Sequence, residues 1–316
     1  MYIKVDSLKD ITDEKYHGRV IAGGTDLMPL LHLGVKPRTD MIDISGIAEC
    51  KTITSDETAF TIGACVTLAQ IAENDGIRKN LPALAESAQE TASPQIRNTA
   101  TIGGNIMQDR RCVYFNQSRE WRSSFPPCFK TGGDKCHQIP NSKTCKAIYY
   151  SDTATALLLY DAEVEMIEDG KCSVVPIGQL IARHSERNGL VEENSDFIIT
   201  AIRVKKAPLD EKSCFFKYSV RASIDFPLVN FAVRLPSEKR CAKVVAGAVG
   251  AVPVELEETA TLLDENISDV ERLTEAAFSE IKKQAGQIRE SVVSPKVKVM
   301  SYKLIAMLLD RLAAKA

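Results

Sequence analysis

A pair of glycines between a strand pattern and a helix pattern constrains this chain more than any other feature. Residues 19–22 (RVIA) predict a short strand, Gly23 and Gly24 follow, and residues 26–33 (DLMPLLHL) have the apolar spacing of a helix. Residues 40–44 (DMIDI) again predict a strand, so this part of the chain is expected to form a small βαβ unit. Glycine lets backbone N–H groups approach a phosphate, because no Cβ is in the way, and a helix N-terminus adds favourable partial charge. The spacing matches neither G-x-G-x-x-G nor the P-loop, so the residues alone leave a phosphate-binding turn and an ordinary turn open.

A second glycine pair repeats this chemistry. Gly103 and Gly104 are flanked by Thr101 and Asn105, whose side chains can form hydrogen bonds. Two such turns that converge on one pyrophosphate would form a better site than either turn alone. The sequence therefore predicts that the two segments lie close together.

The rest of the chain alternates between strand and helix patterns. Breaks in these patterns predict domain boundaries near residue 55 and near the Lys-Ala-Pro stretch at 206–208. Strands are predicted at 60–64, 162–167, 171–175, 197–204, 215–220, 230–235 and 241–249, and helices from about 68, at 82–92, from 152 and over most of 268–315 with an interruption near 294–295.

Composition and charge exclude several function classes. The chain has 316 residues, 26% of them charged, and a formal net charge of -2, which is not the clustered basic surface of a nucleic-acid-binding protein. The first residues, MYIKVDSLKD, resemble neither a signal peptide nor a transit peptide, and no apolar run is long enough to cross a membrane. We therefore expect a cytoplasmic protein that binds neither nucleic acid nor a membrane.

The nine cysteines fall into two groups. Five are scattered through predicted strands and helices, where a free cysteine is usually a small buried hydrophobe: Cys50, Cys65, Cys172, Cys214 and Cys241. The other four share a segment of low periodicity at about 108–150: Cys112, Cys128, Cys136 and Cys145. Four thiolates suit tetrahedral zinc or a cubane iron–sulfur cluster, and their spacing does not separate the two. His137 is expected beside this set rather than in it, because four sulfurs complete a ligand set.

Four blocks of the sequence resemble, in order, the FAD-binding medium subunits of the molybdenum hydroxylases, a family that includes those of carbon monoxide dehydrogenase and xanthine dehydrogenase. The blocks are AGGTDLMPLL, RNTATIGGNI, SDTATALLLYDAEVEM and FFKYSVRASIDFPLVN. The resemblance implies an α+β chain: a two-subdomain FAD-binding fold of the vanillyl-alcohol-oxidase (PCMH) type, followed by a C-terminal α+β domain of the CO dehydrogenase flavoprotein type. The expected domains are 1–55, 56–207 with an insertion at about 108–150, and 208–316.

The same resemblance implies a set of FAD-binding residues. On their own, Asp152 is also a satisfactory helix cap and Lys217 could lie on a solvated strand face. The diphosphate would be lined by Gly23, Gly24, Thr25, Asp26, Thr101, Gly104 and Asn105. Ser151, Asp152 and Lys217 would also contact FAD. Further family positions that contact FAD match Arg19, Ile21, Ala22, Ala92 and Ile199.

The insertion resembles that of the FAD subunits of 4-hydroxybenzoyl-CoA reductases, which carry an additional 4Fe-4S cluster. This resemblance implies that Cys112, Cys128, Cys136 and Cys145 bind such a cluster. It also implies an electron-transfer subunit that relays electrons from ferredoxin or a similar carrier through 4Fe-4S and FAD. They would pass to a 2Fe-2S small subunit and a molybdenum-cofactor large subunit, where the substrate reacts, so no catalytic residue is expected in this chain.

Two alternatives stay open at this stage. The same cofactors could pass electrons outward in a xanthine- or aldehyde-oxidising complex. In a different class, a non-redox protein could hold a nucleotide at the glycine segments and zinc at the cysteines. The sequence fixes neither the direction of electron flow nor the organic substrate.

Overall fold

A computed structural model describes residues 1–13, 18–188, 197–208, 210–221, 224–235, 237, 240–266, 268–285 and 294–313. It begins with a small parallel sheet in the order β1-β3-β2. The predicted βαβ unit is confirmed, because β2 (Arg19–Ile21) and β3 (Met41–Asp43) pair in parallel and are joined through α2 (Leu27–His32). Strand β1 (Tyr2–Lys4) and helix α1 (Leu8–Asp13) precede the unit and were not predicted.

The second sheet has five strands in the order β4-β5-β8-β6-β7, and each neighbouring pair is antiparallel. The first sheet ends at Asp43, and the second begins with β4 at Ile53. The domain boundary near residue 55 stays a prediction. The strands are β4 (Ile53–Ser55), β5 (Ala59–Gly63), β8 (Phe197–Lys205), β6 (Glu163–Glu168) and β7 (Lys171–Pro176); the helices around them are α3 (Leu68–Glu73), α4 (Asp75–Asn80), α5 (Pro82–Gln89), α6 (Pro94–Arg97), α7 (Ile102–Ile106), α9 (Asp152–Leu159) and α10 (Ile177–Asn188).

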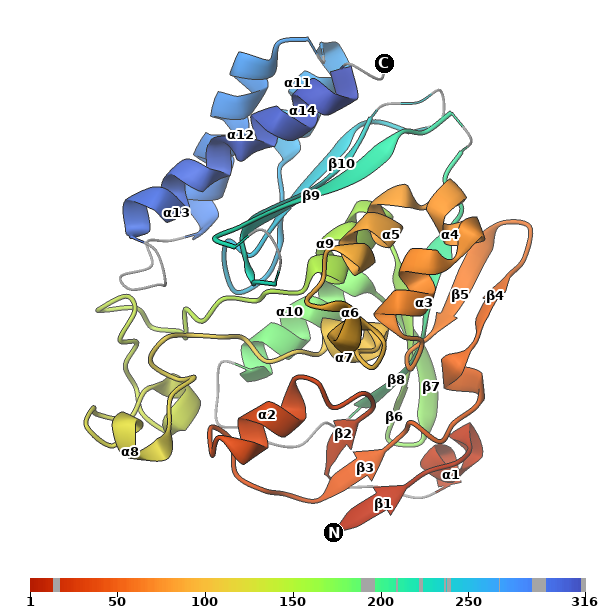
Figure 1. The fold of residues 1–316 in the computed structure, drawn as a ribbon, viewed down its shortest axis with the longest axis vertical. Helices are drawn as coiled ribbons and strands as arrows, with labels where there is room; N and C mark the ends of the chain where they lie inside the picture. The colour runs from red at the N-terminus through yellow and green to blue at the C-terminus, as the bar shows by residue number, and fades with distance from the viewer. Residues whose placement is uncertain are drawn as a thin grey trace.

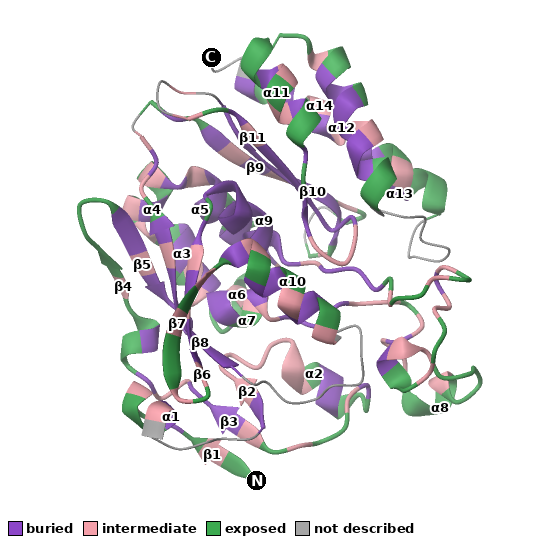
Figure 2. Cartoon of the chain, turned by 180° about the vertical axis from the view of Figure 1, so that it is seen from behind, coloured by how far each residue is buried: buried purple, intermediate pink, exposed green. Residues whose placement is uncertain are grey.

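The third sheet, in the order β12-β11-β10-β9, carries helices on both faces (Figure 1). Helices α5 and α9 contact one face, and the C-terminal helices cover the other. Every residue of β10 is therefore buried, as Figure 2 shows. The elements are β9 (Ser213–Ser219), β10 (Pro227–Arg234), β11 (Lys243–Gly247), β12 (Val254–Glu255), α11 (Glu257–Glu265), α12 (Val270–Ala285), α13 (Pro295–Ser301) and α14 (Ile305–Ala313).

Helix α9 lies in the middle of the molecule. All of its residues are buried, because it packs against both α5 and the third sheet. Its N-cap is Ser151, whose hydroxyl accepts a hydrogen bond from the amide of Ala154 at 3.1 Å. Of the two predicted caps the structure selects Ser151, which leaves the Asp152 carboxylate for other partners.

The insertion has little regular structure. It contains α8 (Arg119–Arg122) and the 3₁₀ helix Phe129–Thr131, and in Figure 1 it projects from the body beside α2. Phe115 packs with Leu30 and Val35 in a small hydrophobic cluster of its own. In the part of the chain that the structure describes, no helix is both long and apolar enough to span a bilayer.

Candidate functional site

The two glycine segments lie against each other. A Cβ on Gly23 would come within 2.0 Å of the Thr99 carbonyl oxygen, so the two backbones are in direct contact there. Gly24 has φ +68°, in the left-handed region where glycine is favoured. This contact brings the predicted phosphate-binding segments to one place.

The second segment is a short helix rather than a turn, which corrects the prediction. Residues 102–106 form α7, and the Thr101 hydroxyl caps it by accepting a hydrogen bond from the Gly104 amide at 3.1 Å. A Cβ on Gly103 would lie 2.9 Å from the Ala64 carbonyl oxygen, so this glycine allows α7 to pack closely on the end of β5.

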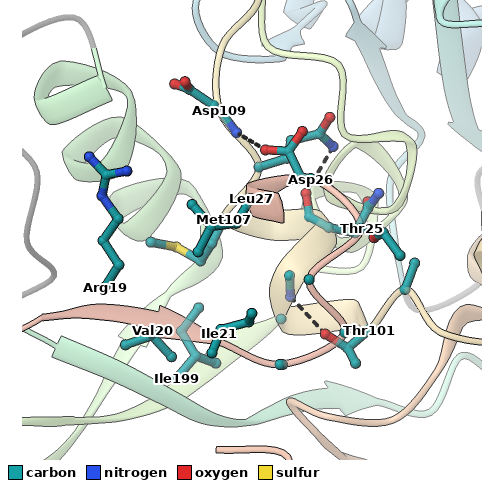
Figure 3. Close-up of a pocket in the computed structure, with 18 of the residues that line it drawn as sticks. Arg19, Val20, Ile21, Thr25, Asp26, Leu27, Thr101, Met107, Asp109 and Ile199 are labelled. Carbon is teal, nitrogen blue, oxygen red and sulfur yellow. Dashed lines mark hydrogen bonds between the residues drawn. The ribbon is translucent and has the colours of Figure 1, made fainter. Parts of the chain in front are cut away.

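A cavity of about 310 Å³ is lined by these segments and by residues of α10 and β8 (Figure 3). Its wall contains all but three of the predicted FAD-contacting residues. Those in the wall are Arg19, Ile21, Ala22, Gly23, Gly24, Thr25, Asp26, Ala92, Thr101, Gly104, Asn105 and Ile199.

The other three predicted residues lie in a buried polar network behind the cavity wall. The Asn105 side-chain oxygen accepts a hydrogen bond from the Ser151 hydroxyl at 2.7 Å. The Asp152 carboxylate accepts bonds from Lys217 Nζ at 2.9 Å and from the Asn230 amide at 2.6 Å. Burial raises the pKa of Asp152, and the Lys217 charge opposes that shift. Ser151 is joined to the cavity wall through Asn105, and Asp152 through the Thr91 hydroxyl at 3.5 Å, while the contact of these residues with FAD stays a prediction.

Asp26 is held in place by residues that the sequence did not single out. Its carboxylate accepts a hydrogen bond from the Asp109 amide at 2.9 Å, which a dashed line in Figure 3 marks, and pairs with the Arg111 guanidinium. The Arg111 guanidinium carbon lies 4.6 Å from the centroid of the Phe226 ring, a cation–π distance. Arg111 and Phe226 both line the cavity, and no motif at either position points to this role.

The charge of the cavity wall suits an anionic ligand. Burial lowers the pKa of His184, whose Nε2 lies 3.0 Å from the Gln108 carbonyl oxygen, so this wall residue is neutral at pH 7. Cationic side chains outnumber carboxylates in the wall, which holds Arg19, Lys36, Arg111 and Arg187 against Asp26 and Asp109. Glycine backbone beside a cationic wall is what a dinucleotide diphosphate requires.

The four cysteines of the insertion line one small pocket, together with Lys130 and other residues. Cys145 Sγ accepts a hydrogen bond from the Ala147 amide at 3.5 Å, and Cys128 Sγ accepts one from the Thr131 hydroxyl at 3.6 Å. The cysteine pocket, lined by Cys112, Cys128, Cys136 and Cys145, encloses about 20 Å³. Across the described residues, no three His, Cys, Asp or Glu side chains are placed to hold one metal ion together.

The remaining cysteines follow the burial prediction in part. Cys50 and Cys65 are buried and Cys214 is partly buried. For Cys172 and Cys241 the prediction is wrong, because both are exposed. Cys172 lies on β7, the edge strand of the second sheet, where one side of the strand faces solvent.

Comparison with known families and proteins agrees with this geometry. The family described as the FAD-binding domain in molybdopterin dehydrogenase matches residues 2–205. The FAD-binding subunit PaoB of aldehyde oxidoreductase from Escherichia coli K12 is 31% identical over 250 residues, which are 76% of this chain and 77% of that protein. The xanthine dehydrogenase FAD-binding subunit of E. coli O157:H7 is 28% identical over 83% of this chain and 78% of its own length.

Solved structures share the fold over nearly the whole chain. CO dehydrogenase from Oligotropha carboxidovorans matches with a TM-score of 0.74 and 18% identity, covering 100% of this chain and 98% of the other. Quinoline 2-oxidoreductase from Pseudomonas putida 86 matches with a TM-score of 0.70 and 18% identity, covering 99% and 96%. The predicted α+β fold of the CO dehydrogenase flavoprotein type is confirmed.

Proposed function

Because this chain belongs to the family of FAD-binding subunits of molybdenum hydroxylase-type oxidoreductases, we propose that it is an electron-transfer subunit carrying both FAD and a 4Fe-4S cluster, similar to that of 4-hydroxybenzoyl-CoA reductases. The observation that carries this proposal is that Cys112, Cys128, Cys136 and Cys145 line a single pocket next to the cofactor cavity. Membership of a flavoprotein family also excludes the non-redox alternative.

The FAD would occupy the cavity between the two glycine segments. Gly23, Gly24 and Gly104 would lie along the diphosphate, where the excess of cationic over anionic side chains in the cavity wall favours its negative charge. When bound, FAD can take up one or two electrons, which lets it stand between one-electron and two-electron partners. The residues of this chain bind and orient the cofactor, while the substrate reacts in another subunit.

The donor set of the cysteine pocket is four thiols, which is the ligand set of a 4Fe-4S cluster. A tetrahedral zinc site needs thiolates about 3.8 Å apart, as follows from Zn–S bonds of about 2.3 Å. Each thiolate of a 4Fe-4S cluster instead binds a different iron atom, so the four cysteines need not converge on a single ion. A cluster would need more space than the 20 Å³ of the cysteine pocket, so the cysteine side chains would have to change rotamer when it binds.

The expected partners follow from the family. We expect a molybdenum-cofactor large subunit, a 2Fe-2S small subunit and an external one-electron carrier such as ferredoxin, in the cytoplasm where thiols stay reduced. In this arrangement electrons would enter at the cysteine pocket and reach the flavin across residues 109–112, which separate the two sites.

Anaerobic purification of the complex tests the proposal. We expect about four iron atoms and four acid-labile sulfides bound to this chain after its separation from the iron–sulfur small subunit, with one FAD. A reduced-state electron paramagnetic resonance signal should disappear in a variant that lacks the four cysteines. Stoichiometric zinc, or intact thiols without metal in anaerobic protein, would refute the 4Fe-4S assignment.

A second candidate is supported by the relatives named for aldehyde and xanthine oxidation. In that case electrons flow outward, from the organic substrate through FAD to the carrier. Activity of the whole complex with an aromatic acyl-CoA and reduced ferredoxin, compared with purine and aldehyde oxidation, separates the two functions.

A further inference from the structure

One short strip of chain separates the cofactor cavity from the cysteine pocket. Asp109 and Arg111 line the cavity, whereas Cys112 lines the cysteine pocket. This alternation is that of an extended strand, and Arg111 does form an antiparallel bridge with Ile148. We call residues 109–112 the shared wall.

Arg110 lies on the cysteine side of the shared wall. Its side chain is 3% exposed, and its Nη1 donates to the carbonyl oxygens of Cys145 and Ala147, both at 3.3 Å. Both acceptor residues line the cysteine pocket. The guanidinium is near enough to Cys145, Asp109 and Cys136 that negative charge on any of them interacts with it. An arginine keeps its charge in a protein, so this position brings a permanent buried cation to the thiolates.

A second buried cation in the same region is already compensated. Lys130 lines the cysteine pocket, but its Nζ lies 2.6 Å from the Asp109 carboxylate and also donates to the Arg110 carbonyl oxygen at 2.8 Å. Lys36 approaches the other oxygen of Asp109 at 3.2 Å. The Lys130 charge therefore acts mainly on Asp109.

We propose that Arg110 is a positioning residue that sets the reduction potential of the iron–sulfur centre relative to the flavin. This inference rests on the proposed function, because it concerns the group that the four cysteines would hold. Reduction adds one electron, and no bond forms or breaks, so a fixed positive charge nearby favours the reduced state. The charge acts strongly here because it is buried on the cysteine side of the wall, with the cavity on the other side.

Potentiometric titration of the anaerobic complex with dithionite tests the proposal. Arg110→Gln removes the charge but keeps an amide that can donate to the two carbonyl oxygens. It should shift the equilibrium between the reduced centre and the flavin about tenfold toward the reduced flavin, which is about 59 mV for a one-electron couple. Arg110→Lys keeps the charge, so its reduction potential should stay close to that of the wild-type protein.

Arg119→Gln is the matched control, because Arg119 is an exposed arginine of the same insertion. It should leave the potential unchanged, since solvent screens its charge. An equal shift in Arg119→Gln, or an unchanged potential in Arg110→Gln with full iron content, overturns the inference. Loss of iron in both Arg110 variants also overturns it, because Arg110 would then be needed only for the pocket to form. Absence of iron from the wild-type chain is the separate failure of the proposed function.

Discussion

The contact between the two glycine segments gives the sharpest prediction for flavin binding. In Gly23→Ala the new methyl group would start 2.0 Å from the Thr99 carbonyl oxygen, and ordinary contact begins near 3.4 Å. The two segments would have to separate by about 1.4 Å, because both atoms belong to the backbone or are fixed to it. Overpacking of this size costs about 1–3 kcal/mol. If that strain falls on the cavity, the dissociation constant for FAD should rise about 10- to 100-fold.

The assay is titration of the deflavinated complex with FAD, followed by flavin fluorescence, together with thermal unfolding. Gly178→Ala in α10 is the control: its methyl group would lie 3.4 Å from a Leu158 methyl carbon, an ordinary contact, so affinity should not change. If Gly23→Ala binds FAD with wild-type affinity, the two segments do not form the site together and the reasoning fails.

Three further predictions concern the buried charges and the cysteines. Cys128→Ser should lose iron while keeping FAD, whereas Cys65→Ser, a change in the buried core, should keep both; equal iron in the two variants would refute the cysteine assignment. Lys217→Met should lower the free energy of unfolding, measured by denaturant titration, by about 3–5 kcal/mol, because it leaves the Asp152 carboxylate buried without its cation. The double variant with Asp152→Asn should recover much of this loss. Burial lowers the pKa of Lys298 from 10.5 to about 7. Between these pH values the unfolded chain therefore binds more protons than the folded chain, so the free energy of unfolding should rise with pH. Lys298→Met should abolish this rise.

The sequence predicted the parts of the site that depend on local pattern. Gly23 and Gly24 follow a strand and precede a helix, and the cavity forms there. Thr101 could also have indicated a helix, because a threonine three residues before the amide that it caps is a common N-terminal signal, but the glycine pair suggested a turn instead. The four insertion cysteines were grouped correctly because no periodic core pattern surrounds them.

The parts that were missed depend on tertiary contacts. Arg111 and Phe226 come from the insertion and from the connection between β9 and β10, and they meet only because the third sheet packs beside the insertion. Likewise, β4 follows the first sheet in sequence but pairs with β5, which a strand pattern alone does not specify. Neither contact leaves a signal in residue spacing.

The way in which the insertion is attached explains how the cysteine pocket, the proposed iron–sulfur site, can lie beside the cavity without disturbing it. The Asn105 side-chain oxygen, on the last turn before the insertion, accepts hydrogen bonds from the Ser151 and Thr153 hydroxyls just after it, at 2.7 and 2.6 Å. Both ends are therefore fixed at one point, and a longer loop adds little entropic cost. Further into the insertion, two backbone hydrogen bonds between Arg111 and Ile148, at 2.8 and 2.9 Å, hold its two ends together again. They also hold the shared wall against the cavity. Cys112 is the last residue of that wall, so the geometry that closes the loop also brings the cysteine pocket next to the cavity.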